Sequence, residues 1–396
     1  MNDRAPALRE LHARGAVRAL LASQIREVAN AGMGDAEILP FWFGEPDEVT
    51  PAFIRDAAAA SLAAGETFYT QNFGIPELRA AISAYLSRLR RPIAPENVAV
   101  TASGMSALML TVEALVDPGD RIVCITPLWP NLTEIPRILG AEVVRVALEF
   151  GERGWRLDLE RLLSALAPGT RAVMINSPNN PTGWTLDREA CEAILAHCRR
   201  HGIWIIADDV YERLYYAGET PSAPAPSLLA LAEAGERIVS TNSFSKAWLM
   251  TGWRLGWIVA PAALMPDLGK LIEYNTSCSP VFVQRAGVVA ITEGEPTVLH
   301  TRERLRAARD FLLGELARIP GIHAAPPAGA MYAFFRVDGV TDSLAFCKAL
   351  VREAKLGLAP GSAFGPEGQG FVRWCFAASR DRLVEGVRRL EAFLDR

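Results

Sequence analysis

Residues 243–257 place a single lysine, Lys246, among serines, glycines and three tryptophans. The whole chain has only four lysines, although Lys and Arg together number 41. A lysine that is taken out of water can lose its proton and attack a carbonyl group, which an arginine cannot do. Lys246 is therefore a candidate nucleophile. The alternative is a surface lysine whose aliphatic stem lies along the tryptophans while its charged head stays in water.

The elements that could position this lysine follow from the apolar runs. From residue 97 to about residue 260, short β-branched runs alternate with amphipathic helices. Most runs are apolar throughout, which is typical of strands buried on both faces. Helical connections between successive strands predict a largely parallel α/β sheet with helices on both faces. The seven expected strands are 98–101, 121–126, 142–146, 171–176, 203–208, 238–242 and 255–260.

The pattern differs on either side of this region. Residues 1–46 contain helical turns at about 6–31 and an aromatic run. After residue 292 we expect, in order, a helix at about 295–318, a strand at 331–337, a helix at about 342–354, a Gly/Pro-rich loop at 357–370, a strand at 371–376 and a final helix. We therefore expect a large sheet domain at 47–292 and a smaller α+β domain built from the 1–46 arm and residues 293–396.

Five of the expected strands end in residues that could do chemistry. Open parallel sheets bind ligands outside the carboxyl ends of their strands, so these residues should converge on one edge. The turn at 176–183 has two X-Pro steps, which could fix an asparagine amide in one place. The residues expected at the edge are Ser103 with Gly104, Trp129, the 176–183 turn, Asp208 with Tyr211, and Ser243 with Lys246.

Three of the candidate residues have both a chemical and a structural interpretation. The helix that starts at Ser103, Gly104 and Met105 offers free amides to a phosphate, or Ser103 is an ordinary N-cap. Asp208 follows an apolar strand, so it either meets a cation, or Asp208 or Asp209 caps a helix. Arg373 lies in an apolar strand, so it is either a bidentate clamp for a carboxylate or half of a buried ion pair.

Composition argues against several function classes. With a net charge of −4 and scattered arginines, the chain gives no basis for binding nucleic acid or an anionic membrane. The six cysteines form no C-x-x-C pair and the N-terminus lacks an apolar signal core, so we expect reduced thiols in a cytoplasmic protein. His197 and His201 have zinc-like spacing but lack a third ligand, so we expect no metal site. Glycine motifs for a dinucleotide or a hydrolase nucleophile are also absent.

Taken together, the motifs resemble those of the fold-type I pyridoxal-phosphate enzymes, in particular the class I/II aminotransferases of the aspartate aminotransferase group. The matching stretches follow the family order and cover nearly the whole chain. Two departures are a phosphate loop that reads Ser-Gly-Met and an acidic motif, Asp208-Asp209, where Asp-Glu is commoner. The matching stretches are 69–79, 103–104, 180–183, 207–211, 243–246 with 252–254, and 361–365 followed by Val372 and Arg373.

The resemblance implies a pyridoxal 5′-phosphate cofactor. Lys246 would form the Schiff base, Asp208 would keep the pyridine nitrogen protonated, and Arg373 would bind the substrate α-carboxylate. A homodimer with shared sites would move an amino group between an L-amino acid and a 2-oxo acid in a ping-pong reaction. The other implied roles are Tyr211 and Asn180 at the ring phenolate, Trp129 on the ring face, Ser103, Gly104, Met105, Ser243, Ser245 and Arg254 at the phosphate, Tyr69 at the neighbouring subunit's phosphate, and Gly44, Trp129 and Asn180 at the substrate.

Other functions fit part of the pattern. A C–S β-lyase, a decarboxylase or a cyclising lyase would use the same lysine and aspartate. A non-catalytic ligand-sensing regulator would need a DNA-binding module, and residues 1–46 show no helix-turn-helix and no basic face. The substrate stays open. No second arginine is clearly placed for a dicarboxylate, and the aromatic run at 41–43 suits either an apolar side-chain pocket or core packing.

Overall fold

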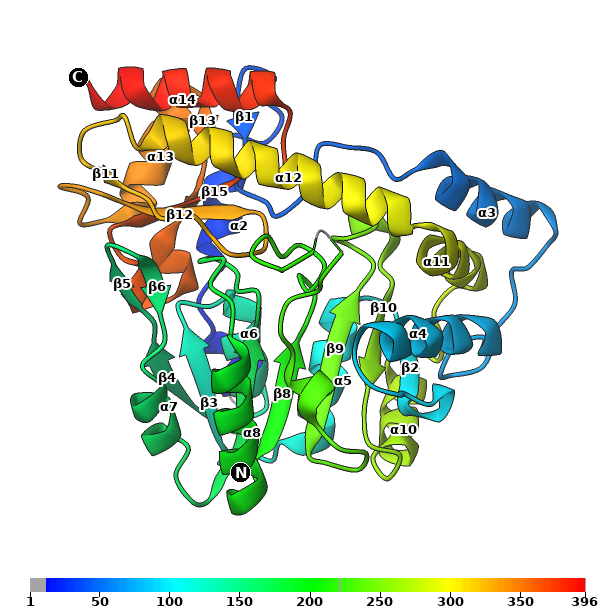
Figure 1. Cartoon of the computed structure of the whole chain (residues 1–396). Helices are drawn as coiled ribbons and strands as arrows, with labels where there is room; N and C mark the ends of the chain where they lie inside the picture. The colour runs from blue at the N-terminus through cyan, green and yellow to red at the C-terminus, as the bar shows by residue number, and fades with distance from the viewer. Residues whose placement is uncertain (1–11, 221, 396) are drawn as a thin grey trace, which may run out of the picture.

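A seven-stranded sheet forms the centre of the computed structural model, which describes residues 12–220 and 222–395 (Figure 1). Its strands are β2 (Val98–Thr101), β3 (Arg121–Thr126), β4 (Glu142–Ala147), β7 (Thr170–Asn176), β8 (Trp204–Asp208), β9 (Ile238–Ser243) and β10 (Gly256–Val259). They lie in the order β2-β10-β9-β8-β7-β3-β4. Six strands point the same way, and β10 runs antiparallel to both of its neighbours. The predicted α/β fold is confirmed, and each expected strand is found to within one residue at either end.

Helices cover both faces of this sheet because its strands are apolar on both sides. In β7, Val173 and Ile175 face one helical layer while Ala172 and Met174 face the other, and all four are at most 2% exposed. One layer consists of α3 (Ala52–Ala63), α4 (Pro76–Leu89), α7 (Leu159–Ala165), α8 (Arg188–His201), α9 (Leu228–Leu231) and α11 (Val281–Glu293). The other consists of α5 (Gly104–Leu115), α6 (Pro130–Ile138) and α10 (Met265–Asn275).

A second, smaller body lies at one end of the large sheet (Figure 1). Its four-stranded antiparallel sheet has the order β11-β12-β15-β14. The strands are β11 (Ile322–His323), β12 (Tyr332–Val337), β14 (Ala359–Pro360) and β15 (Phe371–Cys375). The helices packed with them are α2 (Gln24–Asn30), α12 (Glu295–Leu316), α13 (Ser343–Ala354) and α14 (Arg380–Leu394).

The N-terminal arm packs into this smaller body. Strand β1 (Leu39–Pro40) pairs in parallel with β13 (Leu356–Gly357), and Trp42 and Trp374 share one hydrophobic core. The division of the chain at residues 46 and 292 stays a prediction. The helical turns expected at 6–31 fall partly outside the described chain, because the structure does not describe residues 1–11. The other short elements are α1 (Gly15–Arg18) and the hairpin of β5 (Glu149–Gly151) and β6 (Gly154–Arg156).

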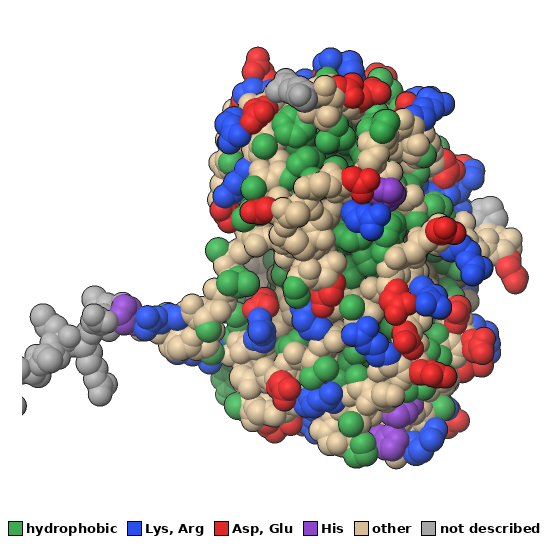
Figure 2. Space-filling model, turned by 90° about the vertical axis from the view of Figure 1, so that its left-hand side faces the viewer, with side chains coloured by type: hydrophobic (Ala, Val, Ile, Leu, Met, Phe, Trp, Pro, Cys, Tyr) green, Lys and Arg blue, Asp and Glu red, His purple; other side chains and the backbone are tan. Residues whose placement is uncertain are grey.

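The surface and the thiols agree with the composition. On the face shown in Figure 2, Lys and Arg side chains are interspersed with Asp and Glu rather than gathered by sign. All six cysteines are free thiols, and five of them are buried. His197 Nε2 lies 2.8 Å from the Leu166 carbonyl oxygen, which gives this histidine a structural partner. None of the described helices has the length and apolar character that crossing a bilayer requires.

Candidate active site

A cavity of about 760 Å³ lies at the carboxyl edge of the large sheet, against the smaller body. Ser103 is buried but does not line this cavity, and Tyr69 is 91% exposed outside it. The structure therefore collects twelve of the fourteen predicted site residues in one place. Those twelve are Gly44, Gly104, Met105, Trp129, Asn180, Asp208, Tyr211, Ser243, Ser245, Lys246, Arg254 and Arg373.

Lys246 follows β9 in a turn and directs its amine into this cavity. Nζ donates a hydrogen bond to the Gly44 carbonyl and lies 5.9 Å from the centre of the Tyr211 ring. Burial lowers the pKa of the Lys246 amine to about 8, because the charged form loses its hydration. The nearby Trp248 and Trp257 are core residues, at 2% and 0% exposure. The surface-lysine interpretation is therefore wrong.

Asp208 ends β8 and is 5% exposed. Its Oδ2 accepts a hydrogen bond from Asn176 Nδ2 at 3.2 Å, and its Oδ1 accepts one from the Val210 amide at 3.4 Å. These amide donors carry no net charge, so burial raises the pKa of the Asp208 carboxyl to about 7. No described helix begins here, so the helix-cap interpretation is wrong. A cation placed in the cavity beside Asp208 would stabilise its ionised form.

The amino end of α5 supplies free amides. Ser103 Oγ accepts from the Ser106 amide at 3.0 Å, so the N-cap interpretation of this side chain is correct. The amides of Gly104 and Met105 belong to the first turn, where a helix has no internal acceptor for them. A Cβ at Gly256 would lie 2.6 Å from the Gly104 nitrogen, so glycine there allows α5 to approach the sheet closely.

Two serines and an arginine complete this end of the cavity. Ser243 Oγ donates to Ser245 Oγ at 2.8 Å, and both hydroxyl groups line the cavity. Arg254 precedes the antiparallel strand β10, whose first residue therefore lies at the edge where its neighbours end. Its Nη1 donates to the Thr251 carbonyl at 2.6 Å. Free amides, hydroxyls and a guanidinium form a donor set that suits a phosphate.

Arg373 lies on β15 and is only 2% exposed. Its Nη1 donates to Asn180 Oδ1 at 2.8 Å and its Nη2 donates to the Trp42 carbonyl. The guanidinium carbon lies 4.4 Å from the centre of the Tyr332 ring, and Nε has no hydrogen-bond partner among the described residues. Because no carboxylate of the described chain pairs with it, the ion-pair interpretation is wrong. A buried guanidinium of this kind is suited to a carboxylate ligand.

Tyr332 lines the cavity but escaped the sequence reasoning, whereas Asn176 was expected at the sheet edge as the first residue of the 176–183 turn. Asn176 ends β7 directly opposite Asp208, so the parallel register places its amide on that carboxylate. Tyr332 Oη lies 2.6 Å from Tyr211 Oη, and a Cβ at Gly44 would lie 1.9 Å from the same oxygen. The register of β7 and β8 could have identified Asp208 as the partner of Asn176. Nothing in the local sequence around Tyr332 indicates its position, which depends on how the two bodies pack.

The aromatic run at 41–43 serves both core packing and the cavity wall. Phe41 and Trp42 are core residues at 3% and 5% exposure, whereas Phe43 lines the cavity. The guanidinium carbon of Arg26 lies 4.5 Å from the centre of the Phe43 ring, and Arg26 also lines the cavity. Arg26 lines the cavity in addition to Arg254 and Arg373, and the sequence reasoning missed it because α2 approaches the cavity only in the folded chain.

The fold and the site define an α/β enzyme with a half-buried lysine, a buried aspartate and a phosphate-type donor set. The family model for aminotransferase class I and II matches residues 38–390. The aspartate aminotransferase of Pyrococcus horikoshii is 34% identical over 377 residues, which are 94% of this chain and 95% of that protein. The arginine–pyruvate transaminase of Pseudomonas aeruginosa is 35% identical over 368 residues, 92% of each chain.

Solved structures agree with the sequence relatives. A Thermus thermophilus aspartate aminotransferase mutant superposes with a TM-score of 0.89 at 31% identity, covering 96% of this chain and 99% of that one. The chain belongs to the aminotransferase class I and II family, and it is an aminotransferase. The sequence-based prediction of the family and of the reaction class is confirmed.

Proposed function

We propose that this aminotransferase holds pyridoxal 5′-phosphate against Lys246 and moves an amino group between an L-amino acid and a 2-oxo acid. The observation that supports this most is a single cavity that collects Lys246, Asp208 and Arg373. Bound pyridoxal phosphate would supply an aldehyde carbon for the amino group and a ring that withdraws electrons from the substrate α-carbon.

The residues present fit each part of that group. Asp208 is buried and forms no ion pair with another residue of the described chain, and a protonated ring nitrogen would provide that partner. Ser243, Ser245, Arg254 and the first-turn amides of α5 would hold the phosphate. Trp129, whose amide donates to the Asn180 carbonyl at 2.8 Å, would cover one ring face.

Lys246 would then serve as general base and acid. With a pKa near 8, its amine exists partly in the neutral form at neutral pH and can accept the proton of the substrate α-carbon. Arg373 would hold the substrate α-carboxylate and so fix which bond at that carbon faces Nζ. The phenol of Tyr211 and the amide of Asn180, which also line the cavity, would bind the ring phenolate oxygen.

A half-reaction tests the proposal. The holoenzyme is mixed with a panel of amino acids and no 2-oxo acid, and the products are counted per active site. We expect one equivalent of the matching 2-oxo acid, no free ammonia, and turnover only after a second 2-oxo acid is added. Continuous release of pyruvate and ammonia from a cysteine conjugate would instead identify a C–S β-lyase.

We also propose that two chains share their sites. Phe68, Tyr69 and Tyr274 are 84%, 91% and 90% exposed, and the 68–72 loop lies beside Tyr274 because Asn72 Nδ2 donates to Glu273 Oε2. Three exposed aromatic rings in one region are typical of a surface that is covered by a partner. Sedimentation should give a particle of twice the 43.0 kDa chain mass. A monomer at working concentration would contradict this assembly.

Arg26 should recognise a second carboxylate on the substrate. It lines the cavity over Phe43, and no ion pair within the described chain occupies it, since its neighbour Glu27 pairs with Lys348. The aspartate aminotransferases among its relatives act on such a substrate by name. We expect Arg26→Gln to raise the KM for 2-oxoglutarate about 10-fold, equivalent to ~1.4 kcal/mol, through loss of a charged hydrogen bond.

Pyruvate, which lacks the second carboxylate, provides the internal control for this substitution. Its KM should change less than about 2-fold, within the usual effect of a surface substitution. Arg18→Gln is the matched variant, because Arg18 is also an exposed arginine of the arm but does not line the cavity. Equal effects of Arg26→Gln on both 2-oxo acids would show that Arg26 does not select dicarboxylates.

A further inference from the structure

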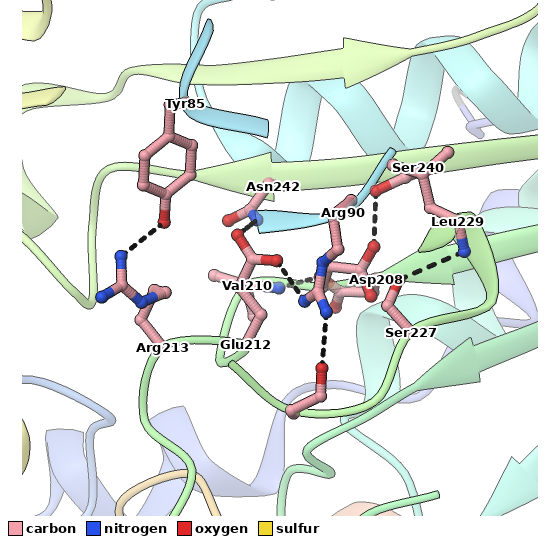
Figure 3. A network of polar contacts seen from close by, with 12 residues as sticks. Tyr85, Arg90, Asp208, Val210, Glu212, Arg213, Ser227, Leu229, Ser240 and Asn242 are labelled. Carbon is pink, nitrogen blue, oxygen red and sulfur yellow. Dashed lines mark hydrogen bonds and ion pairs between the residues drawn. The ribbon is translucent and has the colours of Figure 1, made fainter. Parts of the chain in front are cut away.

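A buried row of polar contacts runs behind the cavity, from Arg90 through Glu212 to Asn242 (Figure 3). Arg90 Nη2 donates to Glu212 Oε2 at 2.6 Å, and both side chains are 4% exposed. The other carboxylate oxygen, Oε1, accepts from Asn242 Nδ2 at 3.0 Å. Arg90 is fixed from a second side, because its Nη1 donates to the Ala225 carbonyl at 2.7 Å. None of the three side chains lines the cavity.

The two ends of the Glu212–Asn242 contact belong to different turns of the site. Glu212 follows the turn after β8 that carries Asp208 and Tyr211, and its amide donates to the Asp209 carbonyl at 2.9 Å. Asn242 lies on β9 next to Ser243, the last residue of that strand, and the turn that carries Ser245 and Lys246 follows. The hydrogen bond therefore joins the turn that faces the ring nitrogen to the turn that faces the phosphate.

Asn242 also acts directly on the second turn. Its Oδ1 accepts from the Ser243 amide at 2.7 Å, while Ser243 Oγ accepts from the Ser245 amide at 3.1 Å. A continuous path of contacts thus leads from the carboxylate of Glu212 to the hydroxyl groups at the phosphate end of the cavity. A second tie lies alongside, where Ser240 Oγ donates to Asp209 Oδ2 at 2.5 Å.

Stability alone does not account for an ion pair at this place. Burying two charges costs hydration, and replacing such a pair by apolar side chains is often neutral or stabilising. The pair fixes an orientation instead. One carboxylate oxygen of Glu212 accepts from Arg90 and the other accepts from Asn242, and this arrangement sets the spacing between the two turns of the site. Side chains that orient binding groups in this way typically change ligand affinity 10- to 100-fold when they are altered.

We propose that Arg90, Glu212 and Asn242 are positioning residues that set the distance between the ring-facing and the phosphate-facing turns. This inference rests on the proposed cofactor. By fixing this distance, the three residues set the length of ligand that the cavity accepts, although none of them touches the ligand. Loss of the contact should therefore weaken cofactor retention more than it weakens the fold.

The residue next to Glu212 along the chain, Arg213, which Figure 3 shows beside Tyr85, supplies a control. Arg213, whose side chain is 2% exposed, donates to Glu295 through Nη2 at 2.5 Å and to Tyr85 Oη through Nη1 at 3.1 Å. Its partners lie on α12 and α4 rather than on either turn. Glu295, whose side chain is 37% exposed, makes no contact with Glu212 or Asn242, so Glu295→Gln removes the charge of a neighbouring Arg–Glu pair and leaves the Glu212–Asn242 contact in place.

The experiment measures the Kd of pyridoxal phosphate and its release rate from the holoenzyme for wild type, E212Q and E295Q, together with the Tm of each protein. We expect E212Q to raise the Kd about 10-fold or more and E295Q to leave it within about 2-fold, and the Tm values show how much of each change follows the stability of the fold. Equal Kd changes in the two variants, or an unchanged Kd in E212Q, would overturn the inference.

R90K provides a second measurement if E212Q does not fold. It keeps the positive charge but loses the fork that reaches both Glu212 and the Ala225 carbonyl. A raised Kd in R90K is the expected result, and an unchanged Kd contradicts the positioning role. If wild type itself fails to bind pyridoxal phosphate, the proposed cofactor is wrong, which is a different outcome from wild type and E212Q binding it equally well.

Discussion

Replacing Lys246 with arginine should abolish amino transfer, lowering kcat by about 10⁴-fold or more, the upper range for loss of a general acid–base group. Arginine keeps the positive charge at the cavity wall but holds its proton at every accessible pH, so it can neither bond to a carbonyl carbon nor accept a proton from the substrate. The measurement is a single-turnover assay of the K246R holoenzyme with a donor amino acid. In wild type, borohydride reduction should leave the cofactor covalently attached to Lys246, which peptide mass spectrometry detects.

The other three lysines serve as controls for this chemistry. Lys270 is exposed and Lys348 and Lys355 are partly exposed, and they form ion pairs with Asp267, Glu27 and Asp35. K270R, K348R and K355R should each retain activity within about 2-fold, and none of these positions should acquire the reduced cofactor. Label on any of them, or substantial turnover by K246R, would show that the buried amine is not the reacting group.

The edge of the sheet could be predicted because its signals are local. Apolar runs ended at polar residues such as Asp208 and Ser243, and parallel strands bring such ends together. The antiparallel strand β10 was not foreseen, yet it explains Arg254: a strand that runs the other way begins where its neighbours end. The register between β7 and β8 likewise places Asn176 beside Asp208.

What could not be predicted depends on contacts between segments far apart in the sequence. Arg26 and Tyr332 reach the cavity only because the arm and β12 pack against the large sheet. Choosing between a ligand clamp and a buried ion pair for Arg373 also required the fold. The local sequence around a buried arginine is the same whether the side chain contacts a carboxylate or a carbonyl oxygen. The structure gives it the oxygens of Asn180 and Trp42, and therefore leaves its charge to a ligand.

Asp208→Asn should lower kcat by about 10²- to 10³-fold, the usual effect of removing one group that stabilises charge in a transition state. Asparagine has nearly the same shape and can still pair with Asn176, but it cannot hold a proton on the ring nitrogen of a bound cofactor. The expected signature is a loss of kcat together with a visible spectrum of the bound cofactor that differs from that of wild type. A D208N enzyme with wild-type kcat would mean that the electron-withdrawing role lies elsewhere.

The same substitution should change the pH dependence of stability in the cofactor-free protein. The pKa of Asp208 is about 7 in the folded chain and 3.8 for an ordinary aspartate, so between these values the folded chain keeps a proton that the unfolded chain has lost. The wild-type free energy of unfolding therefore falls as pH rises through this window, and D208N should lack that part of the decline. At pH 8, wild type buries an ionised Asp208 carboxylate that forms no ion pair within the described chain, so cofactor-free D208N should have the higher Tm. Thermal unfolding of both proteins between pH 5 and pH 8 measures this difference. A lower Tm for D208N at pH 8 would show that the ionised Asp208 side chain stabilises the cofactor-free fold, contrary to this argument.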